Sequence, residues 1–390
     1  MMRGGSRAMG YKYCVLGGGR QGTAAAYDLA QFGEADEIII ADRELDAATR
    51  AVVRVNELVG RRLAHAERVD ATDEQAMTAL LTGVQATISA LPFVFNLAAT
   101  RAAIAAGAHF CDLGGNTDVV KQQLDMDEQA REQGISVIPD CGLMPGLGNI
   151  LAVYAMGLVT NPREVLIYVG GLPLTPRPPF NYLLSFNMDG LINEYSGSAI
   201  YLRGGQPTEV EALTECEELD FPPPLGRCEA FVTSGGTSTV PYNFQGKLQT
   251  YEEKTVRYPG HLDQLIAFKE LGLFEAAPVN AGGVPVRPRD VLAALLAPRI
   301  TFPEDQDVVV MRVICIGDKL ATIDLFDTYD EATGFSAMER TTGFPTALVA
   351  HMMAKRELPA GATPLELAMP AAEYVTRLAE RKFNLSEIVE

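Results

Sequence analysis

Short apolar runs alternate with helix-like segments over roughly the first 140 residues of the chain. The runs have the length and the β-branched content of strands, and they cover residues 11–16, 37–41, 66–69, 86–90, 109–113 and 135–139. Between these runs, apolar side chains recur at helical spacing over residues 23–31, 44–58, 96–106 and 119–133. A further helix is expected to begin at a cap formed by Thr72 or Asp73 and to end at Leu81. Strict alternation of this kind predicts an α/β fold with a doubly wound parallel sheet.

The pattern changes after a helical stretch at residues 149–159. Strand-like runs follow at residues 165–171, 228–233, 238–244, 308–316 and 320–326, and the last two flank Gly317 to Lys319 as a hairpin would. Their alternating apolar positions predict an antiparallel sheet with one exposed face. The tail is helical over residues 336–355 and 371–383, and we expect it to return to the first domain. The expected domains are therefore a Rossmann domain of residues 10–148 and 336–390 and an inserted α+β substrate-binding and oligomerisation domain of residues 149–335.

The first junction between strand and helix carries a dinucleotide-binding pattern. Gly17, Gly19 and Gly22 form Gly-x-Gly-x-x-Gly, and the next strand ends in Asp42, about 20 residues after the last glycine. Gly17 permits the tight turn, Gly19 lets backbone approach a pyrophosphate, and Gly22 lets the helix pack closely on the strand. The alternative is a tight turn that binds no ligand.

Asp42 also bears on which dinucleotide binds. A carboxylate at this position accepts from both ribose hydroxyls and repels a 2′-phosphate, which favours NAD over NADP. Arg43 is either a partner for such a phosphate or a solvated charge at the start of the next helix. Ligands of doubly wound sheets bind at the carboxyl ends of the strands. The further cofactor contacts that we expect from the loop and from these ends are Arg20, Gln21, Asp70, Ala90, Leu91, Pro92, Gly114 and Asn116.

Composition narrows the function classes. The net charge of −18 over 390 residues makes nucleic acid and anionic membrane poor partners, so an anionic substrate needs a locally placed arginine or lysine. The six cysteines are scattered without metal-binding spacing, which predicts no metal site and a reduced, cytoplasmic compartment. No apolar run has membrane-spanning length, and residues 1–10 lack the apolar core of a signal peptide, so we expect an unstructured leader there.

Longer motifs in the chain resemble those of the saccharopine dehydrogenase family and, within it, are most like the L-lysine 6-dehydrogenases. These motifs lie at residues 110–116, 138–146, 190–195, 235–242, 257–261 and 342–347. The resemblance covers nearly the whole chain after the leader. It implies a Rossmann domain completed by C-terminal helices, an inserted mixed α/β domain, and a homo-oligomer that is a dimer or larger. It also implies an NAD- or NADP-dependent reaction at a carbon–nitrogen bond of a lysine-like amino acid.

The reaction that the resemblance favours is oxidation of the ε-amine of L-lysine by NAD, giving 2-aminoadipate 6-semialdehyde, which cyclises, and ammonia. Only a neutral amine can release a hydride, so the ε-ammonium must first lose a proton to a base. Asp112 ends a strand before two glycines and is the first candidate, although it could instead cap a turn through Gly114. Asp140, beside Pro139, is a second candidate for which a turn role is favoured. Cys141 is expected to line the nicotinamide pocket.

The α-carboxylate of the substrate needs a cation, ideally a bidentate arginine. Arg257, in the sequence Arg-Tyr-Pro-Gly-His, is our candidate, with Arg177 and Arg203 as rivals. The other expected substrate contacts are His261, which is equally compatible with a structural role, and Tyr182, Glu194, Thr237 and Ser238. Two other functions stay open. One is a saccharopine-type reaction on a secondary amine, which needs a second cationic site, and the other is a non-catalytic NAD-binding protein.

Overall fold

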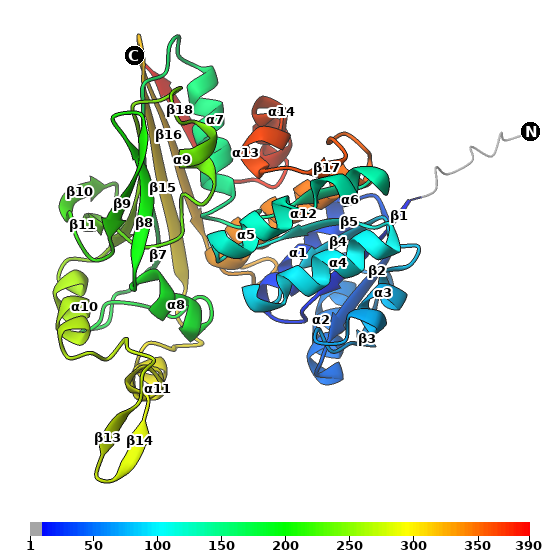
Figure 1. The fold of residues 1–390 in the computed structure, drawn as a ribbon, viewed down its shortest axis with the longest axis horizontal. Helices are drawn as coiled ribbons and strands as arrows, with labels where there is room; N and C mark the ends of the chain where they lie inside the picture. The colour runs from blue at the N-terminus through cyan, green and yellow to red at the C-terminus, as the bar shows by residue number, and fades with distance from the viewer. Residues whose placement is uncertain (1–9) are drawn as a thin grey trace, which may run out of the picture. The chain divides into compact units, whose positions relative to one another are not determined.

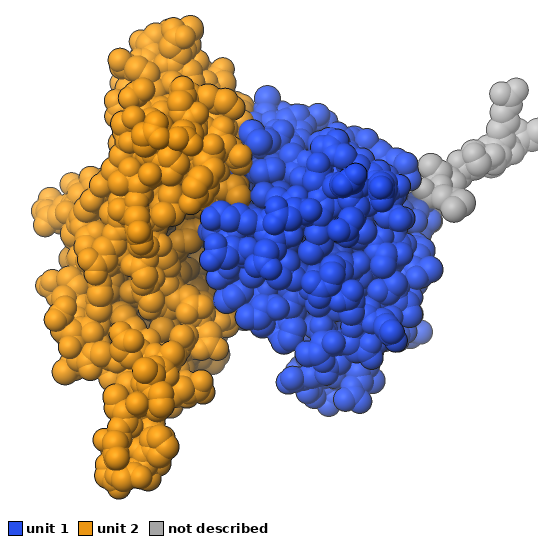
Figure 2. Space-filling model, in the orientation of Figure 1, with its two compact units in different colours: residues 1–147, 339–378 blue, residues 148–338, 379–390 orange. Residues whose placement is uncertain are grey.

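The computed structural model describes residues 10–390 and contains two compact units (Figures 1 and 2). Unit 1 comprises Met1–Leu147 and Glu339–Leu378, and unit 2 comprises Gly148–Met338 and Ala379–Glu390. Residues 1–9 of the expected leader lie outside the described residues. From residue 10 onward, none of the helices combines the length and the apolar character needed to cross a bilayer.

Unit 1 is built on a seven-stranded parallel sheet with the order β17-β6-β5-β4-β1-β2-β3. The strands are β1 Tyr11–Leu16, β2 Ala35–Asp42, β3 Ala64–Arg68, β4 Ala86–Ser89, β5 His109–Asp112, β6 Ser136–Ile138 and β17 Gly361–Ala362. The strand order reverses between β1 and β4, and ligands of such sheets bind where the order reverses. The predicted α/β class and parallel sheet are confirmed.

Helices cover both faces of this sheet (Figure 1). They are α1 Arg20–Phe32, α2 Leu45–Val59, α3 Glu74–Leu81, η1 Phe93–Phe95, α4 Asn96–Ala106, α5 Thr117–Leu124, α6 Asp127–Glu132, α12 Ala337–Ala354, α13 Leu365–Ala368 and α14 Ala371–Ala379. Alternate residues of β1 face opposite layers. Cys14 packs in the core with Met77 and Ala99 of α3 and α4, whereas the Tyr13 hydroxyl lies 3.0 Å from His351 Nδ1 of α12. Helices from the chain's C-terminal part thus complete the first unit, as the fold prediction expected.

The helix predicted over residues 119–133 is two helices, α5 and α6, separated by a turn. Both Leu124 and Met126 pack against the core of unit 1. Residues two apart in one helix point in different directions, so a continuous helix could not bury both side chains. The break lets both of them face the sheet.

Unit 2 contains a nine-stranded sheet that is mostly antiparallel, with the order β10-β11-β12-β7-β15-β16-β18 and with β8 and β9 branching from β12. The strands are β7 Glu164–Pro173, β8 Ser198–Arg203, β9 Gln206–Glu211, β10 Glu217–Phe221, β11 Gly226–Phe231, β12 Thr250–Arg257, β15 Asp307–Ile316, β16 Leu320–Thr328 and β18 Leu385–Val389. A separate hairpin consists of β13 Val279–Ala281 and β14 Val284–Val286. The helices are α7 Leu147–Gly157, α8 Met188–Glu194, α9 Val240–Asn243, α10 His261–Glu270, α11 Pro288–Leu296 and η2 Ala297–Arg299. The predicted β15–β16 hairpin is confirmed.

Two expectations for this part of the chain are wrong. Residues 238–244 form a turn and the short helix α9 instead of a strand, because Pro241 cannot donate to a ladder and Ser238 has a φ of 44°. The last residues, 379–390, belong to unit 2 instead of the first domain. Their strand β18 pairs with β16 and covers an edge that would otherwise expose its backbone hydrogen-bonding groups.

Candidate functional site

The loop between β1 and α1 leaves room for the close approach of a ligand. Gly17 has a φ of 105°, and a Cβ there would lie 2.8 Å from the Ala90 carbonyl oxygen. A Cβ on Gly22 would collide with the Gly17 carbonyl oxygen. A Cβ on Gly19, in contrast, would meet no atom within 4 Å, and no side chain caps α1, which begins at Arg20. The loop therefore presents open backbone at a helix N-terminus, which fits the pyrophosphate of a dinucleotide.

Asp42 lies at the end of β2 and is tied to this loop. Its Oδ2 accepts a hydrogen bond of 2.8 Å from the Gly18 N–H, and its Oδ1 accepts one of 2.9 Å from the Glu44 N–H. Arg43 is 69% exposed in its side chain and pairs with Glu44 at 3.4 Å, which fits the solvated-charge alternative. The Gln21 Oε1 is buried and has no hydrogen-bond partner among residues 10–390. Asp42 and Gln21 thus offer acceptors beside the glycine loop.

Two of the predicted cofactor residues act as local caps. Asp70 Oδ1 accepts hydrogen bonds from both the N–H and the hydroxyl of Thr72, and these bonds lower the pKa of the Asp70 carboxyl. Asn116 caps α5 by accepting from the N–H groups of Asp118 and Val119, at 3.1 and 3.0 Å. Both roles are turn chemistry that Asp and Asn commonly perform. A cofactor role for either side chain stays a prediction.

The remaining predicted cofactor residues lie on the helix and on the strand that border the glycine loop. Arg20, in the first turn of α1, donates from Nε to Glu339 of α12 at 2.9 Å. Ala90, Leu91 and Pro92 follow β4 directly, and the Ala90 N–H continues the ladder by donating to the β1 strand. The contact between Ala90 and Gly17 places this segment against the loop.

Asp112 is completely buried at the end of β5. Its Oδ1 accepts from the Gly114 N–H at 2.8 Å and from the Asp140 N–H at 3.1 Å, while Oδ2 accepts from Gln123 Nε2 at 2.7 Å. Burial raises the pKa of the Asp112 carboxyl, and these three hydrogen bonds oppose the rise. The contacts join the turn after β5 to the turn after β6, which favours the turn-capping alternative. Contact with a substrate amine stays a prediction.

The neighbouring candidates lie in the second of these turns. Asp140 is 5% exposed with a φ of 62°, and a Cβ on Gly114 would collide with its Oδ1. The Cys141 thiol is buried 3.2 Å from the Ile138 carbonyl oxygen, and burial raises its pKa well above the usual range. The Cys141 carbonyl accepts a bond of 2.6 Å from the Thr346 hydroxyl, a contact with α12 that sequence reasoning missed. A neutral buried thiol suits a lining role better than a nucleophilic one.

Replacing Asp112 by asparagine should reduce the free energy of unfolding by about 1–3 kcal/mol, because the buried Gln123 Nε2 donor loses its acceptor. Both the asparagine Nδ2 and Gln123 Nε2 would be donors at the contact now made by Oδ2. Denaturant unfolding of the variant measures this cost. If turnover is unchanged at every pH in the variant, Asp112 has no part in catalysis.

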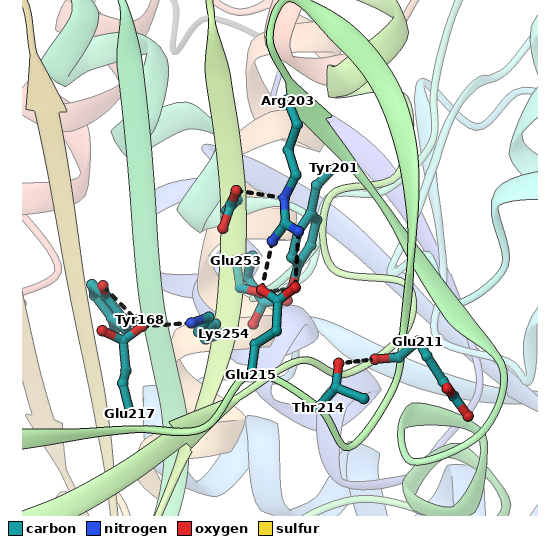
Figure 3. Close-up of polar contacts among 10 residues, drawn as sticks. Tyr168, Tyr201, Arg203, Glu211, Thr214, Glu215, Glu217, Glu253 and Lys254 are labelled. Atoms are coloured by element: carbon teal, nitrogen blue, oxygen red, sulfur yellow. Dashed lines mark hydrogen bonds and ion pairs between the residues drawn. The ribbon is translucent and has the colours of Figure 1, made fainter.

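Unit 2 carries a row of buried polar side chains on one face of β12. Tyr251, Glu253, Thr255 and Arg257 alternate along this face and are at most 7% exposed. The opposite face carries charges in partly exposed ion pairs, including Lys254 with Glu217, as Figure 3 shows. The period of two residues in a strand separates these two sets. One face of β12 thus carries partly solvated ion pairs up to Lys254, and the other carries a buried polar cluster.

Arg257 is the centre of the buried cluster. Its Nε donates to the Tyr195 hydroxyl at 2.9 Å, its Nη1 donates to the Val256 carbonyl at 2.9 Å, and its Nη2 lies 3.5 Å from Glu194 Oε2. The guanidinium carbon lies 5.0 Å from the ring centre of Tyr182, within the range of a cation–π interaction. The structure therefore surrounds one buried cation with a carboxylate and two phenols.

His261 joins the same cluster at the start of α10. Its Nδ1 lies 3.1 Å from the Phe180 carbonyl oxygen, and its Nε2 lies 3.0 Å from the Tyr195 hydroxyl. A carbonyl only accepts, so Nδ1 carries the proton and Nε2 accepts from Tyr195. Burial, with the nearby Arg257 charge, lowers the pKa of His261 to about 3, so the ring is neutral. Four predicted substrate residues, Arg257, His261, Tyr182 and Glu194, thus come together.

The other predicted substrate residues lie in different settings. Thr237 donates to the Ile200 carbonyl at 2.7 Å, and Ser238 adopts its positive φ in the same turn. Arg177 pairs with Glu304 and Asp305. Arg203 makes ion pairs with Glu215 at 2.6 Å and with Glu252 at 2.8 Å, on the solvated face of β12 (Figure 3). These contacts place both rival arginines outside the Arg257 cluster.

Sequence reasoning missed Glu253 and Tyr195 as members of this cluster. Glu253 is 2% exposed, and burial together with the charge of Glu194 raises the pKa of its carboxyl to about 8. Burial also raises the pKa of Glu194 to about 7, although 34% of that side chain remains exposed. Alternation in β12 was the available signal, because it places Glu253 on the same face as Arg257.

Comparison with known proteins matches both units. The Saccharopine dehydrogenase NADP binding domain matches residues 13–138, and the Saccharopine dehydrogenase C-terminal domain matches residues 142–382. Alpha-aminoadipic semialdehyde synthase, mitochondrial, of Bos taurus is 25% identical over 369 residues, which cover 74% of this chain and 38% of the bovine protein. The chain thus spans about two fifths of the length of that relative.

Yeast proteins give a similar result. Saccharopine dehydrogenase (NADP(+), L-glutamate-forming) of Saccharomyces cerevisiae is 23% identical over 278 residues, covering 68% of this chain and 60% of the yeast protein. The structure of saccharopine dehydrogenase (L-Glu forming) from the same organism has a TM-score of 0.76 and 18% identity, and the match covers 98% of this chain and 100% of that one. The structural match shows a shared fold. The two domain matches together show that this chain belongs to the saccharopine dehydrogenase family.

Proposed function

We propose that the protein oxidises the ε-amine of L-lysine with NAD. The products are 2-aminoadipate 6-semialdehyde, ammonia and NADH, with water supplying the aldehyde oxygen. The observation that carries the proposal is the charge of the buried cluster in unit 2, where Arg257 is, among residues 10–390, the one cation that interacts with Glu194 and Glu253. One arginine suits a substrate with one carboxylate, and the two acids suit a substrate that carries amines.

The residues of the glycine loop fit a dinucleotide. The open backbone at Gly19 and the uncapped N-terminus of α1 would hold the pyrophosphate, and Asp42 would accept from the ribose hydroxyls. When bound, the nicotinamide supplies the hydride acceptor for amine oxidation. The protein's own tasks are to orient the amino acid and to accept the ammonium proton. Arg257 is assigned to the α-carboxylate, and Asp112 stays our candidate for contact with the ε-amine, with Asp140 second.

Oxidation of saccharopine or of a similar secondary amine is the second candidate. The names of the bovine and yeast relatives support it, since they describe a saccharopine dehydrogenase and a semialdehyde synthase. Such a substrate has more carboxylates than lysine and needs further cations. Arg177 and Arg203, the rivals to Arg257, are already held by pairs of acids. This difference in charge favours lysine.

Mixing the protein with NAD and L-lysine at mildly alkaline pH tests the proposal. We expect a lysine-dependent rise of NADH absorbance that is absent with buffer alone. A flat trace with L-lysine and a rise with saccharopine and NADP would favour the second candidate. Tight NAD binding without turnover of any amine would favour a non-catalytic protein.

The preference for NAD gives a separate prediction. Replacing Asp42 by alanine should shift the ratio of kcat/KM for NAD to that for NADP toward NADP by about tenfold or more, because a carboxylate that repels a 2′-phosphate is removed. The yeast relatives are named for NADP, so the wild-type ratio must be measured first. Asp36→Ala is the matched control, since Asp36 lies on the same strand and accepts from the Gly10 N–H. A wild-type preference for NADP would refute the assignment of Asp42.

A further inference from the structure

Glu253 is a buried carboxylate with weak internal compensation. Its contact with the Thr255 hydroxyl is long, at 3.4 Å, and that hydroxyl also lies 2.6 Å from the Thr233 hydroxyl. The Tyr201 hydroxyl donates to the backbone carbonyl of Glu253 and not to its side-chain carboxylate. Burying an ionised carboxylate without strong hydrogen-bond donors costs free energy of folding. A positively charged group beside the carboxylate would offset that cost.

Groups from several elements face this carboxylate or the network around it. Glu194 and Tyr195 come from α8, Arg257 and Thr255 from β12, and His261 from α10. His261 is neutral, and the Tyr195 hydroxyl is engaged with both Arg257 and His261. Arg257 is therefore the single positive charge among these groups, beside two carboxyl groups.

A second observation points to a ligand. The Ser185 hydroxyl is 97% buried (3% exposed) and has no hydrogen-bond partner of good geometry among the described residues. It interacts with the Tyr182 phenol, and this interaction opposes the rise that burial causes in the Tyr182 pKa. The Tyr182 ring centre lies 5.0 Å from the Arg257 guanidinium carbon and 5.2 Å from the His261 ring centre. A buried hydroxyl with only this weak partner, at the border of a cluster of one cation and two carboxyl groups, can accept a further polar partner such as a ligand.

We propose that Glu253, together with Glu194, binds the α-ammonium group of a free amino acid whose α-carboxylate is bound by Arg257. Carboxylate and ammonium are attached to the same carbon in an α-amino acid, so their binding groups must also be neighbours. Glu194 Oε2 lies 3.5 Å from Arg257 Nη2, and Glu253 lies four residues before Arg257 on the same face of β12, within the range of electrostatic interaction with both groups. The proposal rests on the proposed function only in taking a free amino acid as the substrate class.

Burial gives this site a pH signature. The Glu253 carboxyl has a pKa of about 8, raised by burial and by Glu194, and is therefore mostly protonated at pH 7 without a ligand. A bound ammonium favours the carboxylate form and lowers that pKa. Ammonium binding at pH 7 therefore releases protons, and the affinity rises as the pH rises through 7 to 8.

The test compares two ligands that cannot be oxidised at an ε-amine, L-norleucine and hexanoate, which differ only in the α-ammonium group. Each is titrated calorimetrically into the full-length protein with saturating NAD at pH 7, in two buffers of different ionisation enthalpy. The variants are Glu253→Gln and Glu194→Gln, since the partly exposed Glu194 tolerates change more easily. Glu252→Gln is the matched control, because Glu252 is the next residue of β12 and pairs with Arg203 on the opposite face.

We expect the wild type and E252Q to bind L-norleucine more tightly than hexanoate, with proton release for norleucine alone. E253Q should weaken norleucine binding by roughly 10- to 100-fold and reduce the proton release, while hexanoate binding changes little. E194Q should act in the same direction. The proposal is overturned if the wild type binds norleucine no more tightly than hexanoate, or if both variants match E252Q. None of these readouts depends on lysine oxidation, so a failure of the proposed function is seen separately, as a flat NADH trace.

Discussion

Replacing Arg257 by methionine should lower kcat/KM for L-lysine by roughly 100- to 1,000-fold and destabilise the fold at the same time. Removing one partner of a buried ion pair typically costs about 3–5 kcal/mol, because the remaining charge is left uncompensated. Arg257 is 4% exposed and lies beside two glutamates whose pKa values its charge lowers. Initial-rate kinetics and denaturant unfolding measure the two effects.

The loss of stability in this variant should depend on pH. Burial already raises the pKa values of Glu194 and Glu253 to about 7 and about 8, so the folded state binds more protons than the unfolded state above the ordinary pKa of Glu. Stability from these groups is fully present below about pH 4 and is lost as the pH rises through the folded values. Without Arg257 both pKa values rise further, so the gap between variant and wild type widens toward pH 8.

Arg203→Met is the matched control for Arg257→Met. Arg203 also pairs with two glutamates, but its side chain is 33% exposed, on the solvated face of β12. Exposed ion pairs contribute about 1 kcal/mol or less, so the control should lose little stability and no activity. An Arg257 variant with a wild-type KM for L-lysine would place the α-carboxylate elsewhere.

The first unit could be predicted from the sequence because its elements follow local rules. Each strand is a short apolar run, each helix is periodic, and the glycines mark the first turn. Predicted strand 11–16 and helix 96–106 agree with β1 and α4. The errors came from tertiary contacts, as in the break between α5 and α6, where two core side chains needed different directions.

The second unit was less predictable because its cluster depends on contacts between distant segments. Glu194 and Arg257 are far apart in sequence, yet they lie 3.5 Å apart in the structure. Periodicity places Glu253 and Arg257 on one face of a strand but does not say that the face is buried. The motif resemblance identified Arg257 and His261 as candidate substrate residues, whereas Glu253 could be identified only from its burial in the structure.

Replacing Gly19 by alanine should separate cofactor binding from folding. Gly19 has a φ of −78°, which any residue adopts, and a methyl group there would meet no atom of the protein within 4 Å. The free energy of unfolding should therefore be unchanged or increase by about 0.4–1 kcal/mol. The methyl group would occupy the space through which a pyrophosphate approaches the backbone. We expect NADH binding, followed by fluorescence titration, to weaken by roughly 10- to 100-fold.

Two other glycine variants serve as controls for Gly19→Ala. Gly157→Ala, at the end of α7 in unit 2, also adds a methyl group in open space and should leave NADH binding unchanged. Gly22→Ala drives a methyl group into the Gly17 carbonyl oxygen, so it should lose both binding and stability. Loss of binding with an intact fold is thus expected from Gly19 alone among the three. If Gly19→Ala binds NADH as the wild type does, the open backbone at this position is not the pyrophosphate site, and the cofactor assignment of the loop fails with it.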